Sequence, residues 1–532
     1  MKLKRLLKDL PVKKIVGSKE VEITGICADS RRVAPGNLFL AKKGLTTDGS
    51  KYAADAAAAG AVVVVTDLYD PFIPSVVQVV CEDVAALEAK LAATYYDYDP
   101  KALFLVGITG TNGKTTTSYL VKHLFDRMWR PCGLIGTIEC IVGDSVFPSK
   151  YTTPDAITNY KLLYEMRGCG DKAAVMEVSS IGIDQGRVEG LVYNAAIFTN
   201  FTQDHLDYHK TMEAYGAAKI KLFAHAAVRI LNADDPFSLQ IYHDLMNTSH
   251  LGGAKASGFE DFSEGCIECI LPSEKSSNRE SFRASRNVKL SIDRGIKEGS
   301  FLTYGIDQSA DVRAEGIVLG PEGTSLTVRY QDQKVSWKSP LIGKFNVYNV
   351  LAVLALAVSE NISLEAAVSA LSTFKTAPGR LERVPNPFGL NVFIDYAHTD
   401  DALSNVLLTL RELKKGKLIT IFGCGGNRDA LKRPKMGAVA TRLSDVAIVT
   451  SDNPRNEDPR LIIEDILKGC EKLPFVEIDR QAAIEKAIAL ATTEDIVLIA
   501  GKGHENYQVF AHHTIDFDDR VHALSAMRQK HA

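Results

Sequence analysis

The sequence has no long hydrophobic run and almost no net charge. None of its 532 residues lies in a stretch of the roughly 18 consecutive apolar residues that a membrane span requires. The formal net charge is -3, so no overall field attracts nucleic acid or an anionic membrane. The basic N-terminus has neither an apolar h-region nor a small-residue cleavage site, which argues against a signal peptide. We therefore expect no nucleic-acid partner and no membrane insertion.

Cysteine is scarce, and its distribution does not suggest a disulfide framework. The nine cysteines are an odd number scattered along a long chain, a pattern typical of reduced thiols in a cytoplasm. Cys266 and Cys269 form a single CxxC pair without a second Cys or His pair nearby, so we expect no zinc site there. These features predict a cytoplasmic protein.

The order of apolar runs predicts an α/β protein with three domains. Short apolar strands alternate with helical patterns along most of the chain, which is typical of parallel sheets covered by helices on both faces. We predict a small N-terminal α/β domain at residues 1–100, a central P-loop-type doubly wound sheet at 101–377, and a C-terminal Rossmann-like sheet at 378–532. A polar excursion near 255–300 interrupts the central domain, and its role stays open.

The central domain is expected to begin with strand 102–109, followed by a helix that starts at Thr115. Further strands are expected at 173–180, 193–200 and 226–234, and a helix at about 346–359. In the C-terminal domain the expected strands are the segments LNVFIDYA, KLITIFG, VAIVTSD and DIVLIAG.

A phosphate-binding loop joins the first central strand to its helix. In GTNGKTTT, residues 110–117, backbone N–H groups can surround phosphate oxygens, and the helix N-terminus adds a positive dipole. Lys114 would neutralise phosphate charge, and the Thr115 hydroxyl would bind Mg²⁺. The strict P-loop pattern has glycine where this chain has Ile108, so the loop is a variant. It predicts a nucleotide, but motors, switches and ligases all carry such a loop.

Four loops in the C-terminal domain place polar side chains after predicted strands. They contain His398, Arg428, the segment 452–455 and Glu505. Ligands of open α/β sheets bind beyond the carboxyl ends of the strands, so we expect these loops to share a pocket. Two arginines and two acids there would suit an amino acid with two carboxylates and two amines. The alternative is that Asp452 and Arg455 only pair with each other at the surface.

A dinucleotide site is not expected in this domain. The segment GCGGNR could begin a glycine-rich dinucleotide loop, but Arg428 replaces its third glycine.

The phosphate loop resembles that of the Mur ligases, which build the peptide stem of peptidoglycan, and of their relative folylpolyglutamate synthase. Other segments agree with the Mur group in family order over nearly the whole chain: ADSRRVAPGNLFLA, YTTPD, MEVSS, TNFTQDHLDYH, AAKIKLF, GKFNVYN, DYAHTDDAL and GKGHE. The resemblance implies three domains, for a UDP-sugar, ATP and an amino acid. This chain departs from the family at Ile181, where histidine is frequent, and at Ala430, where lysine is frequent.

The resemblance also implies a chemistry, the formation of a peptide bond driven by ATP. A carboxylate is a poor electrophile, so the γ-phosphoryl group of ATP is first transferred to it, giving an acyl phosphate. An amine then attacks and phosphate leaves. Because ATP and the carboxylate are both anions, metal ions and cations must offset their repulsion.

The residues that the resemblance assigns to catalysis are Lys114, Glu177, His205 and Lys219. Magnesium would be held by Thr115, Glu177 and His205, with Lys219 as a carbamate formed from CO₂, a reaction that needs the neutral amine. The alternatives are packing roles for Glu177 and His205 and a solvated Lys219. The residues implied to bind ATP are Gly110, Thr111, Asn112, Gly113, Lys114, Thr115, Thr116, Asn349, Asp395 and His398.

Two further sets are implied for the other substrates, UDP-N-acetylmuramoyl-L-alanyl-D-glutamate and meso-2,6-diaminopimelate. Those for the UDP-muramoyl dipeptide are Ser30, Thr152, Thr153, Ser179, Gln185 and Arg187. Those for diaminopimelate are Arg428, Asp452, Asn453, Pro454, Arg455, Gly501 and Glu505.

The DNPR segment carries the implied amino-acid specificity. It has the form found in diaminopimelate-adding Mur ligases, and lysine-adding relatives lack its arginine. Diaminopimelate differs from lysine by one distal carboxylate, which Arg455 could bind bidentately. With lysine bound the guanidinium would be buried without a partner, so discrimination could reach roughly 10³–10⁵-fold.

Three alternatives stay open at this point: the same reaction with L-lysine, a glutamate-adding folate ligase, or a P-loop NTPase whose outer domains bind partners. We expect a monomer.

Overall fold

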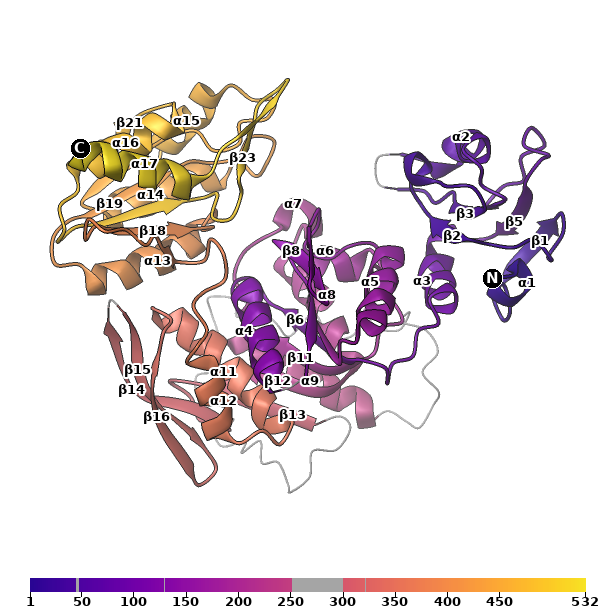
Figure 1. Ribbon diagram of the computed structural model, residues 1–532, viewed down its shortest axis with the longest axis horizontal. Coiled ribbons are helices and arrows are strands. Elements are labelled where there is room, and N and C mark those ends of the chain that lie inside the picture. Colours follow the sequence, from indigo (N-terminus) through magenta and orange to yellow (C-terminus); the bar gives the residue numbers. More distant parts are fainter. Residues whose placement is uncertain (45–46, 129, 251–299, 321) are drawn as a thin grey trace, which may run out of the picture. The chain divides into compact units, whose positions relative to one another are not determined.

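The computed structural model describes residues 1–44, 47–128, 130–250, 300–320 and 322–532 (Figure 1). The chain divides into two compact units. The first contains Met1–Thr109, Phe125–Ala196 and Ala217–Ala227, and the second contains Gly110–Leu124, Ile197–Gly216 and Val228–Ala532. Nearly all of the predicted polar excursion, with Cys266 and Cys269, lies outside the described residues. Within the described residues, no helix is both long enough and apolar enough to cross a membrane.

The first unit begins with a five-stranded sheet in the order β1-β5-β4-β3-β2. Strands β2 to β5 are parallel, and β1 is an antiparallel edge strand. The strands are β1 (Val12–Val16), β2 (Gly25–Cys27), β3 (Asn37–Leu40), β4 (Val63–Thr66) and β5 (Val77–Cys81). The helices are α1 (Leu3–Leu6), η1 (Ser30–Arg32), η2 (Gly49–Tyr52), α2 (Ala53–Ala58) and α3 (Val84–Tyr95).

The rest of the first unit contains the strand that leads to the phosphate loop. Strand β6 (Phe104–Thr109) pairs in parallel with β10 (Ala173–Glu177), and β10 pairs in parallel with β7 (Cys132–Ile135). Strands β8 (Glu139–Val142) and β9 (Ser145–Pro148) continue this sheet antiparallel. The remaining elements are α5 (Ala156–Cys169), α6 (Ser180–Asp184) and α8 (Met212–Ala224), which begins in the second unit.

Several elements join the two units or belong to the second. Helix α4 (Lys114–Arg127), strand β11 (Tyr193–Phe198) and strand β12 (Ala226–Asn232) cross the unit boundary along the chain. In the second unit β12 is followed in the sheet by β13 (Ser300–Gly305), β14 (Val312–Gly320), β15 (Gly323–Tyr330) and β16 (Gln333–Ser339). Strands β14 to β16 form an antiparallel meander, visible in Figure 1. The helices here are α7 (Leu206–His209), α9 (Pro236–His250), α11 (Lys344–Ser359) and α12 (Leu364–Leu371).

The second unit ends with a six-stranded sheet in the order β17-β18-β22-β19-β20-β21. All neighbours are parallel except the antiparallel edge strand β17. The strands are β17 (Glu382–Arg383), β18 (Asn391–Asp395), β19 (Leu418–Phe422), β20 (Val446–Val449), β21 (Phe475–Val476) and β22 (Ile496–Ala500), with a separate hairpin of β23 (Tyr507–Val509) and β24 (Thr514–Asp516). The helices are α13 (Asp400–Leu413), α14 (Lys432–Leu443), α15 (Pro459–Leu467), α16 (Arg480–Leu490) and α17 (Asp519–His531).

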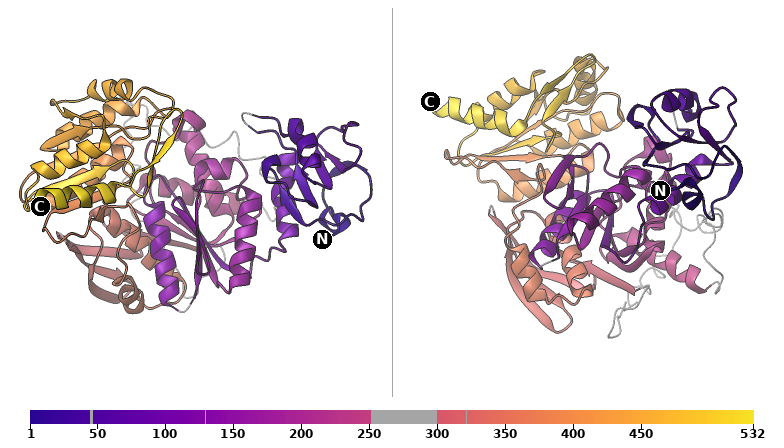
Figure 2. Two further views of the ribbon diagram at one scale, coloured as in Figure 1. Left: turned by 45° about the horizontal axis from the view of Figure 1, so that its top comes forward. Right: turned by 45° about the vertical axis from the view of Figure 1, so that its right-hand side comes forward.

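Alternating strand residues of this six-stranded sheet belong to two hydrophobic clusters, one on each face. Phe422 and Leu498 pack with α13, α14 and α15, whereas Ile421 and Ile499 pack with α16 and α17. Successive side chains of a strand point to opposite faces, so a fully apolar strand is buried only when helices cover both faces. Figure 2 shows helices on both faces of this sheet. The covered faces leave the strand ends to carry polar side chains.

The predicted α/β class is confirmed, with parallel strands at the expected places. Helix α4 starts at Lys114, one residue before the predicted Thr115, and β10 ends at Glu177 rather than continuing to Ser180, because Ser179 caps α6. The antiparallel strands β8, β9 and β14 to β16 were not predicted. The domain ranges 1–100, 101–377 and 378–532 stay predictions.

Candidate active site

The phosphate loop has the backbone conformation that its two glycines allow. Gly110 and Gly113 have φ values of 147° and 87°, in the region that favours glycine. A Cβ at Gly110 would lie 1.8 Å from Oγ1 of Thr199, and one at Gly113 would lie 2.5 Å from Oδ1 of Asn349. Space and conformation therefore both require glycine at these two positions.

The neighbouring loop after β11 fixes the phosphate loop. Thr111 N donates to Asn200 O at 2.8 Å, and Asn112 N donates to Asn200 Oδ1 at 2.8 Å. Thr199 Oγ1 donates to Asn112 O at 2.6 Å, and Thr111 Oγ1 donates to Thr202 O at 3.1 Å. These four hydrogen bonds therefore hold the phosphate loop against the loop that follows β11.

Lys114 folds back over the loop. Its Nζ donates to the carbonyl oxygens of Gly110 at 3.0 Å and Thr111 at 2.9 Å. This position keeps the ammonium at the mouth of the loop, where a triphosphate would need a cation. Thr115 and Thr116 follow in the first turn of α4, and both are buried.

Arg380, which was not predicted, contacts the phosphate loop. Its Nη2 donates to Thr115 Oγ1 at 2.9 Å, and its guanidinium lies 4.8 Å from the centre of the Tyr396 ring. Asp401 accepts a hydrogen bond from Asn112 Nδ2 at 2.9 Å. The C-terminal part of the second unit therefore supplies a cation and an acid to the loop.

The three predicted nucleotide residues outside the loop have different environments. Asn349 Oδ1 accepts from Thr117 Oγ1 at 3.3 Å, and Asn349 Nδ2 donates to Asn346 Oδ1 at 3.0 Å. Asp395 is buried and accepts from Leu381 N at 2.6 Å, which fixes the residue next to Arg380. Burial raises the pKa of Asp395, although the Arg380 charge opposes this shift. His398 is exposed, with Nδ1 2.9 Å from Tyr396 O.

His205 has an unusual backbone. It precedes α7 with a φ of 54°, a left-handed conformation that a non-glycine residue adopts only where its surroundings hold it. Its Nε2 lies 3.5 Å from Asp204 Oδ2. Burial opposes the charge on Asp204, but His205, His398 and Lys114 together lower the pKa of this carboxyl. Asp204 was not predicted as a site residue.

In the first unit Glu177 anchors the residues predicted for the UDP-muramoyl dipeptide. The side chain is fully buried at the end of β10 and accepts from Thr137 N and Thr137 Oγ1, both at 2.9 Å. Thr137 Oγ1 also lies 3.1 Å from Thr152 Oγ1, within hydrogen-bond distance. The Glu177 carbonyl accepts from Thr153 Oγ1 at 2.9 Å. Thr137 was not predicted as a site residue.

The other predicted residues of this set lie beside Thr153. Ser179 N donates to Thr153 Oγ1 at 2.9 Å, and the Ser179 hydroxyl accepts from Gly182 N at the start of α6. Arg187 Nη1 donates to Thr153 O at 2.7 Å, and its Nη2 donates to Gln185 Oε1 at 2.6 Å. The structure therefore brings Thr152, Thr153, Ser179, Gln185 and Arg187 together. Ser30 is the first residue of η1, in the segment between β2 and β3.

The predicted magnesium ligands belong to both units. Glu177 and Lys219 lie in the first unit, and Thr115 and His205 in the second, so the ligand geometry stays a prediction. Lys219 is 1% exposed on α8. Among the described residues no group of three or more His, Cys, Asp and Glu side chains is arranged to hold a metal. The predicted magnesium ligands would not form such a group, because a threonine and a carbamate supply two of the four ligands.

The loops after β18, β22, β19 and β20 lie next to one another because these strands are adjacent and parallel. Asn453 Nδ2 donates to Glu505 Oε2 at 2.8 Å, which joins the β20 and β22 loops. Arg455 Nη1 donates to Gly426 O at 2.9 Å, which joins the β20 and β19 loops. We call these loops, with the residues predicted for diaminopimelate, the C-terminal rim.

Arg455 does not pair with Asp452. Its φ is 54°, and its guanidinium lies against Gly425, where a Cβ would come within 2.8 Å of Nη1. Asp452 is 8% exposed, and its Oδ2 lies where a Cβ on Gly501 would come within 2.7 Å. Among the described residues no ion pair joins the two side chains, so the alternative of a mutual surface pair is wrong. Arg428 is exposed at the same rim.

The floor of the rim contains a lysine that was not predicted. Lys502 is fully buried, and its Nζ lies 3.1 Å from Glu505 Oε2 and 3.3 Å from Asn453 Oδ1. Burial raises the pKa of Glu505, and Lys502 opposes that shift. Glu505 was predicted from the GKGHE segment, but the segment does not indicate that the Lys502 side chain points into the protein.

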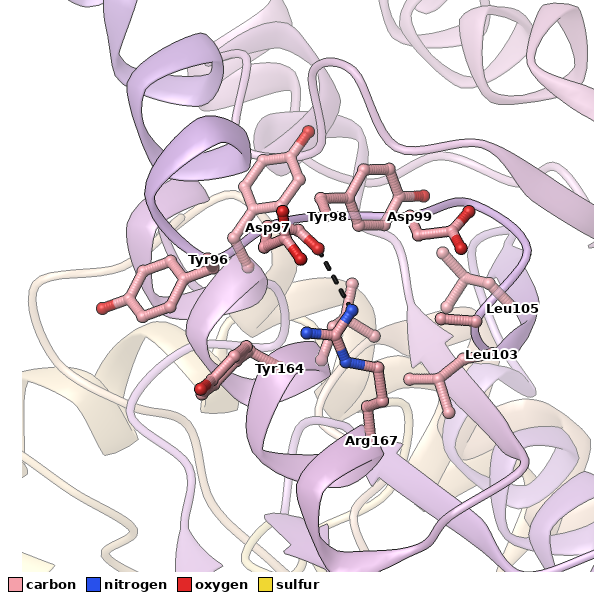
Figure 3. Close-up of a pocket in the computed structure, with 11 residues that line it drawn as sticks. Tyr96, Asp97, Tyr98, Asp99, Leu103, Leu105, Tyr164 and Arg167 are labelled. Atoms are coloured by element: carbon pink, nitrogen blue, oxygen red, sulfur yellow. Dashed lines mark hydrogen bonds between the residues drawn. The ribbon is translucent and has the colours of Figure 1, made fainter. Parts of the chain in front are cut away.

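A shallow pocket elsewhere in the first unit contains none of the predicted site residues. It is lined by Tyr96, Asp97, Tyr98, Asp99, Ala102, Leu103, Leu105, Tyr160, Leu163, Tyr164 and Arg167. Figure 3 shows Arg167 directed at Asp97, whose carbonyl accepts from Arg167 Nη1 at 3.1 Å. The pocket lies where the chain leaves α3.

Known proteins resemble this chain along its whole length. Three family models match it: the Mur ligase family catalytic domain at residues 22–96, the Mur ligase middle domain at 108–267 and 284–357, and the glutamate ligase domain of Mur ligases at 379–503. A UDP-N-acetylmuramoyl-L-alanyl-D-glutamate–2,6-diaminopimelate ligase of Chlamydia pneumoniae is 41% identical over 530 residues, covering 98% of each chain. A ligase of the same name from Bacillus cereus is 40% identical over 528 residues, covering 99% of this chain and 98% of the relative.

A solved structure of a ligase with that name agrees with the fold. It has 30% sequence identity and a TM-score of 0.65, and it covers 100% of this chain and 99% of the other. The similarity thus includes the phosphate loop, the Glu177 cluster and the C-terminal rim. On these matches, the chain belongs to the Mur ligase family.

Proposed function

We propose that this chain is an ATP-dependent, ADP-forming ligase that adds meso-2,6-diaminopimelate to UDP-N-acetylmuramoyl-L-alanyl-D-glutamate in peptidoglycan precursor synthesis. The observation that carries the proposal is the C-terminal rim, in which Arg455 and Arg428 lie with Asp452 and Glu505 at adjacent strand ends. The full-length similarity to ligases of that name supports it.

ATP would bind at the 110–115 loop. The backbone N–H groups of the loop and the α4 N-terminus would hold the phosphates, with Lys114 beside them. Arg380 would add positive charge next to Thr115, where the γ-phosphoryl group is transferred. Asn349, Asp395 and His398 would complete the nucleotide side.

Magnesium would be held by Thr115, Glu177, His205 and the carbamate of Lys219. The donors suit the ion in part, because Glu177 offers two carboxylate oxygens and Thr115 a hydroxyl, and magnesium prefers oxygen. When bound, the ion would neutralise phosphate charge as the acyl phosphate forms. Thr137 would orient the Glu177 carboxylate through its two hydrogen bonds.

The second substrate would lie against the Glu177 cluster. Arg187 offers a cation to a carboxylate or phosphate, while Thr152, Thr153, Ser179 and Gln185 offer hydroxyls and an amide. Ser30 would contact the uridine end, as the family resemblance implies. The amine of diaminopimelate would then attack the acyl phosphate, displacing phosphate.

The distal end of diaminopimelate would be recognised at the rim. Arg455 uses Nη1 for Gly426 O and Asn453 O, and its Nε and Nη2 donate to no group within the described residues, so these two donors could bind a carboxylate. Asp452 and Glu505 would meet the ammonium groups. We also propose a cytoplasmic location and a monomer.

An amino-acid panel tests the proposal. Purified protein would receive ATP, Mg²⁺ and UDP-N-acetylmuramoyl-L-alanyl-D-glutamate with meso-diaminopimelate, L-lysine, L-glutamate or no amino acid, and product mass and phosphate would be measured. We expect a product with diaminopimelate alone. A lysine adduct, a requirement for a folate acceptor, or ATP hydrolysis without the muramoyl dipeptide would each favour the corresponding alternative.

A further inference from the structure

A fully buried ion pair lies beneath the C-terminal rim, and neither of its residues is among the site residues described above. Arg480 is 1% exposed, and so is Asp519; the two form a bidentate pair with Nε–Oδ1 and Nη2–Oδ2 distances of 2.8 Å. Arg480 is the first residue of α16, and Asp519 is the first residue of α17. The pair therefore joins the N-terminal ends of the two helices that cover one face of the sheet.

The same guanidinium also reaches two strand ends. Nη2 donates to Ala500 O at 3.0 Å, and Nη1 donates to Ser451 O at 3.5 Å. Ala500 is the last residue of β22, immediately before Gly501, and Ser451 immediately precedes Asp452. In the sheet order, β19 separates β22 from β20, so Arg480 connects two loops that are not neighbours through backbone pairing.

The two connected loops contact each other directly above Arg480. A Cβ on Gly501 would come within 2.7 Å of Asp452 Oδ2, so their relative position has little tolerance. Arg480 is also within electrostatic range of the two rim acids. Its burial opposes the charge, but Asp519, and after it Asp452 and Glu505, raise the pKa of Arg480 on balance.

Stability alone is a poor reason for this arrangement. A cation in the first turn of a helix is opposed by the helix dipole, and a buried ion pair is often no more stable than apolar residues of similar size. What an apolar pair could not provide is the set of donors to the carbonyls of Ser451 and Ala500.

We propose that Arg480, held by Asp519, is a positioning residue that sets the spacing between the 451–455 and 501–505 loops and thereby the affinity for the diamino diacid. The inference rests on the proposed function, because it assigns these loops to that substrate. Lysine cannot replace Arg480, since one ammonium cannot match the bidentate carboxylate and two carbonyls in the same plane.

The test compares KM values for three substrates in the full-length protein. For Arg480→Lys we expect the KM for meso-diaminopimelate to rise on the order of 10- to 100-fold, with the KM for ATP and for the UDP-muramoyl dipeptide within about twofold of wild type. The matched control is Arg442→Lys on α14, which alters an exposed ion pair with Glu471 and should change none of the three KM values.

A second variant covers the case in which Arg480→Lys does not fold. Arg480→Met combined with Asp519→Leu removes the pair but keeps an apolar core, so its Tm should stay near that of wild type while the diaminopimelate KM still rises selectively. Equal changes in all three KM values, or unchanged kinetics in the double variant, would overturn the positioning role. Wild-type protein that adds no diaminopimelate at all would instead refute the proposed function, so the two failures are distinguishable.

Discussion

Arg380 Nη2 donates a 2.9 Å hydrogen bond to Thr115 Oγ1, across 265 residues of sequence. The contact brings a guanidinium from the start of the C-terminal sheet to the threonine predicted to hold magnesium. Arg380 is itself fixed by its neighbour, because Leu381 N donates to the buried Asp395 carboxylate. The charge at the phosphate loop therefore depends on the C-terminal part of the second unit.

Replacing Arg380 should lower turnover more than substrate affinity. Because its charge would act on the phosphoryl group as it moves, we expect Arg380→Ala to reduce kcat on the order of 10²-fold. Steady-state kinetics with saturating ATP measures this. Arg383→Ala, which removes an exposed arginine bonded to Asn391, is the control and should leave kcat unchanged. A kcat for Arg380→Ala near wild type would contradict this role.

Thr137→Val should weaken the response to magnesium. The change removes the hydroxyl that donates to Glu177 Oε2, while the backbone N–H to Oε1 remains. A ligand that loses such a partner typically binds its metal about 10- to 100-fold more weakly, so the Mg²⁺ concentration for half-maximal activity should rise by about tenfold or more. Magnesium titrations of activity measure it. Thr94→Val, whose hydroxyl donates to Lys90 O on α3, is the control, and matching curves for the two variants would count against the prediction.

Arg455→Ala should affect diaminopimelate selectively. Loss of a bidentate guanidinium is expected to raise the KM for diaminopimelate on the order of 10²-fold or more, and to leave the KM for ATP nearly unchanged. Discrimination against L-lysine should fall in parallel, as shown by competition between the two amino acids. Arg460→Ala, an exposed residue on α15, should change neither value. Equal increases in both KM values for Arg455→Ala would refute the assignment.

His504 should make stability depend on pH. Burial, with smaller effects of Arg380 and Lys502, lowers the pKa of His504 to about 4. The unfolded chain takes up that proton near pH 6.5, so between pH 6.5 and 4 the unfolded state binds more protons, and the free energy of unfolding falls as the pH falls. The loss from pH 6.5 to 5 should be on the order of 2 kcal/mol. Urea denaturation of wild type and His504→Asn measures it, and equal pH slopes for the two proteins would exclude this origin.

The parts of the fold and site that were predictable are those encoded locally. Gly110, Lys114 and Thr115 stand together between an apolar run and a helix pattern, and Glu177 is a charge at the end of a buried strand. The parallel sheets were predictable because apolar strand segments are followed by helical segments along the chain. Strands β14 to β16 were not predicted, although apolar and polar residues alternate there. The only element predicted in this region was the helix that follows these strands.

The residues that escaped prediction act through tertiary contacts. Thr137 lies 40 residues from Glu177 in the sequence, and Arg480 lies 39 residues from Asp519. The local sequence around these residues does not indicate their partners. Lys502 stands in the GKGHE motif, yet only the folded chain shows that its ammonium turns under Asn453 and Glu505. The rim could be foreseen as a set of strand ends, but not the groups that fix their spacing.

The hydrogen bonds between residues 111–112 and 199–202 determine when the phosphate loop loses its conformational freedom. Backbone order costs about 1–2 kcal/mol for each residue, and here that entropy is lost during folding, before any nucleotide arrives. Because the N–H donors of the loop are oriented before the phosphates bind, binding loses less conformational entropy, and more of the interaction free energy contributes to affinity.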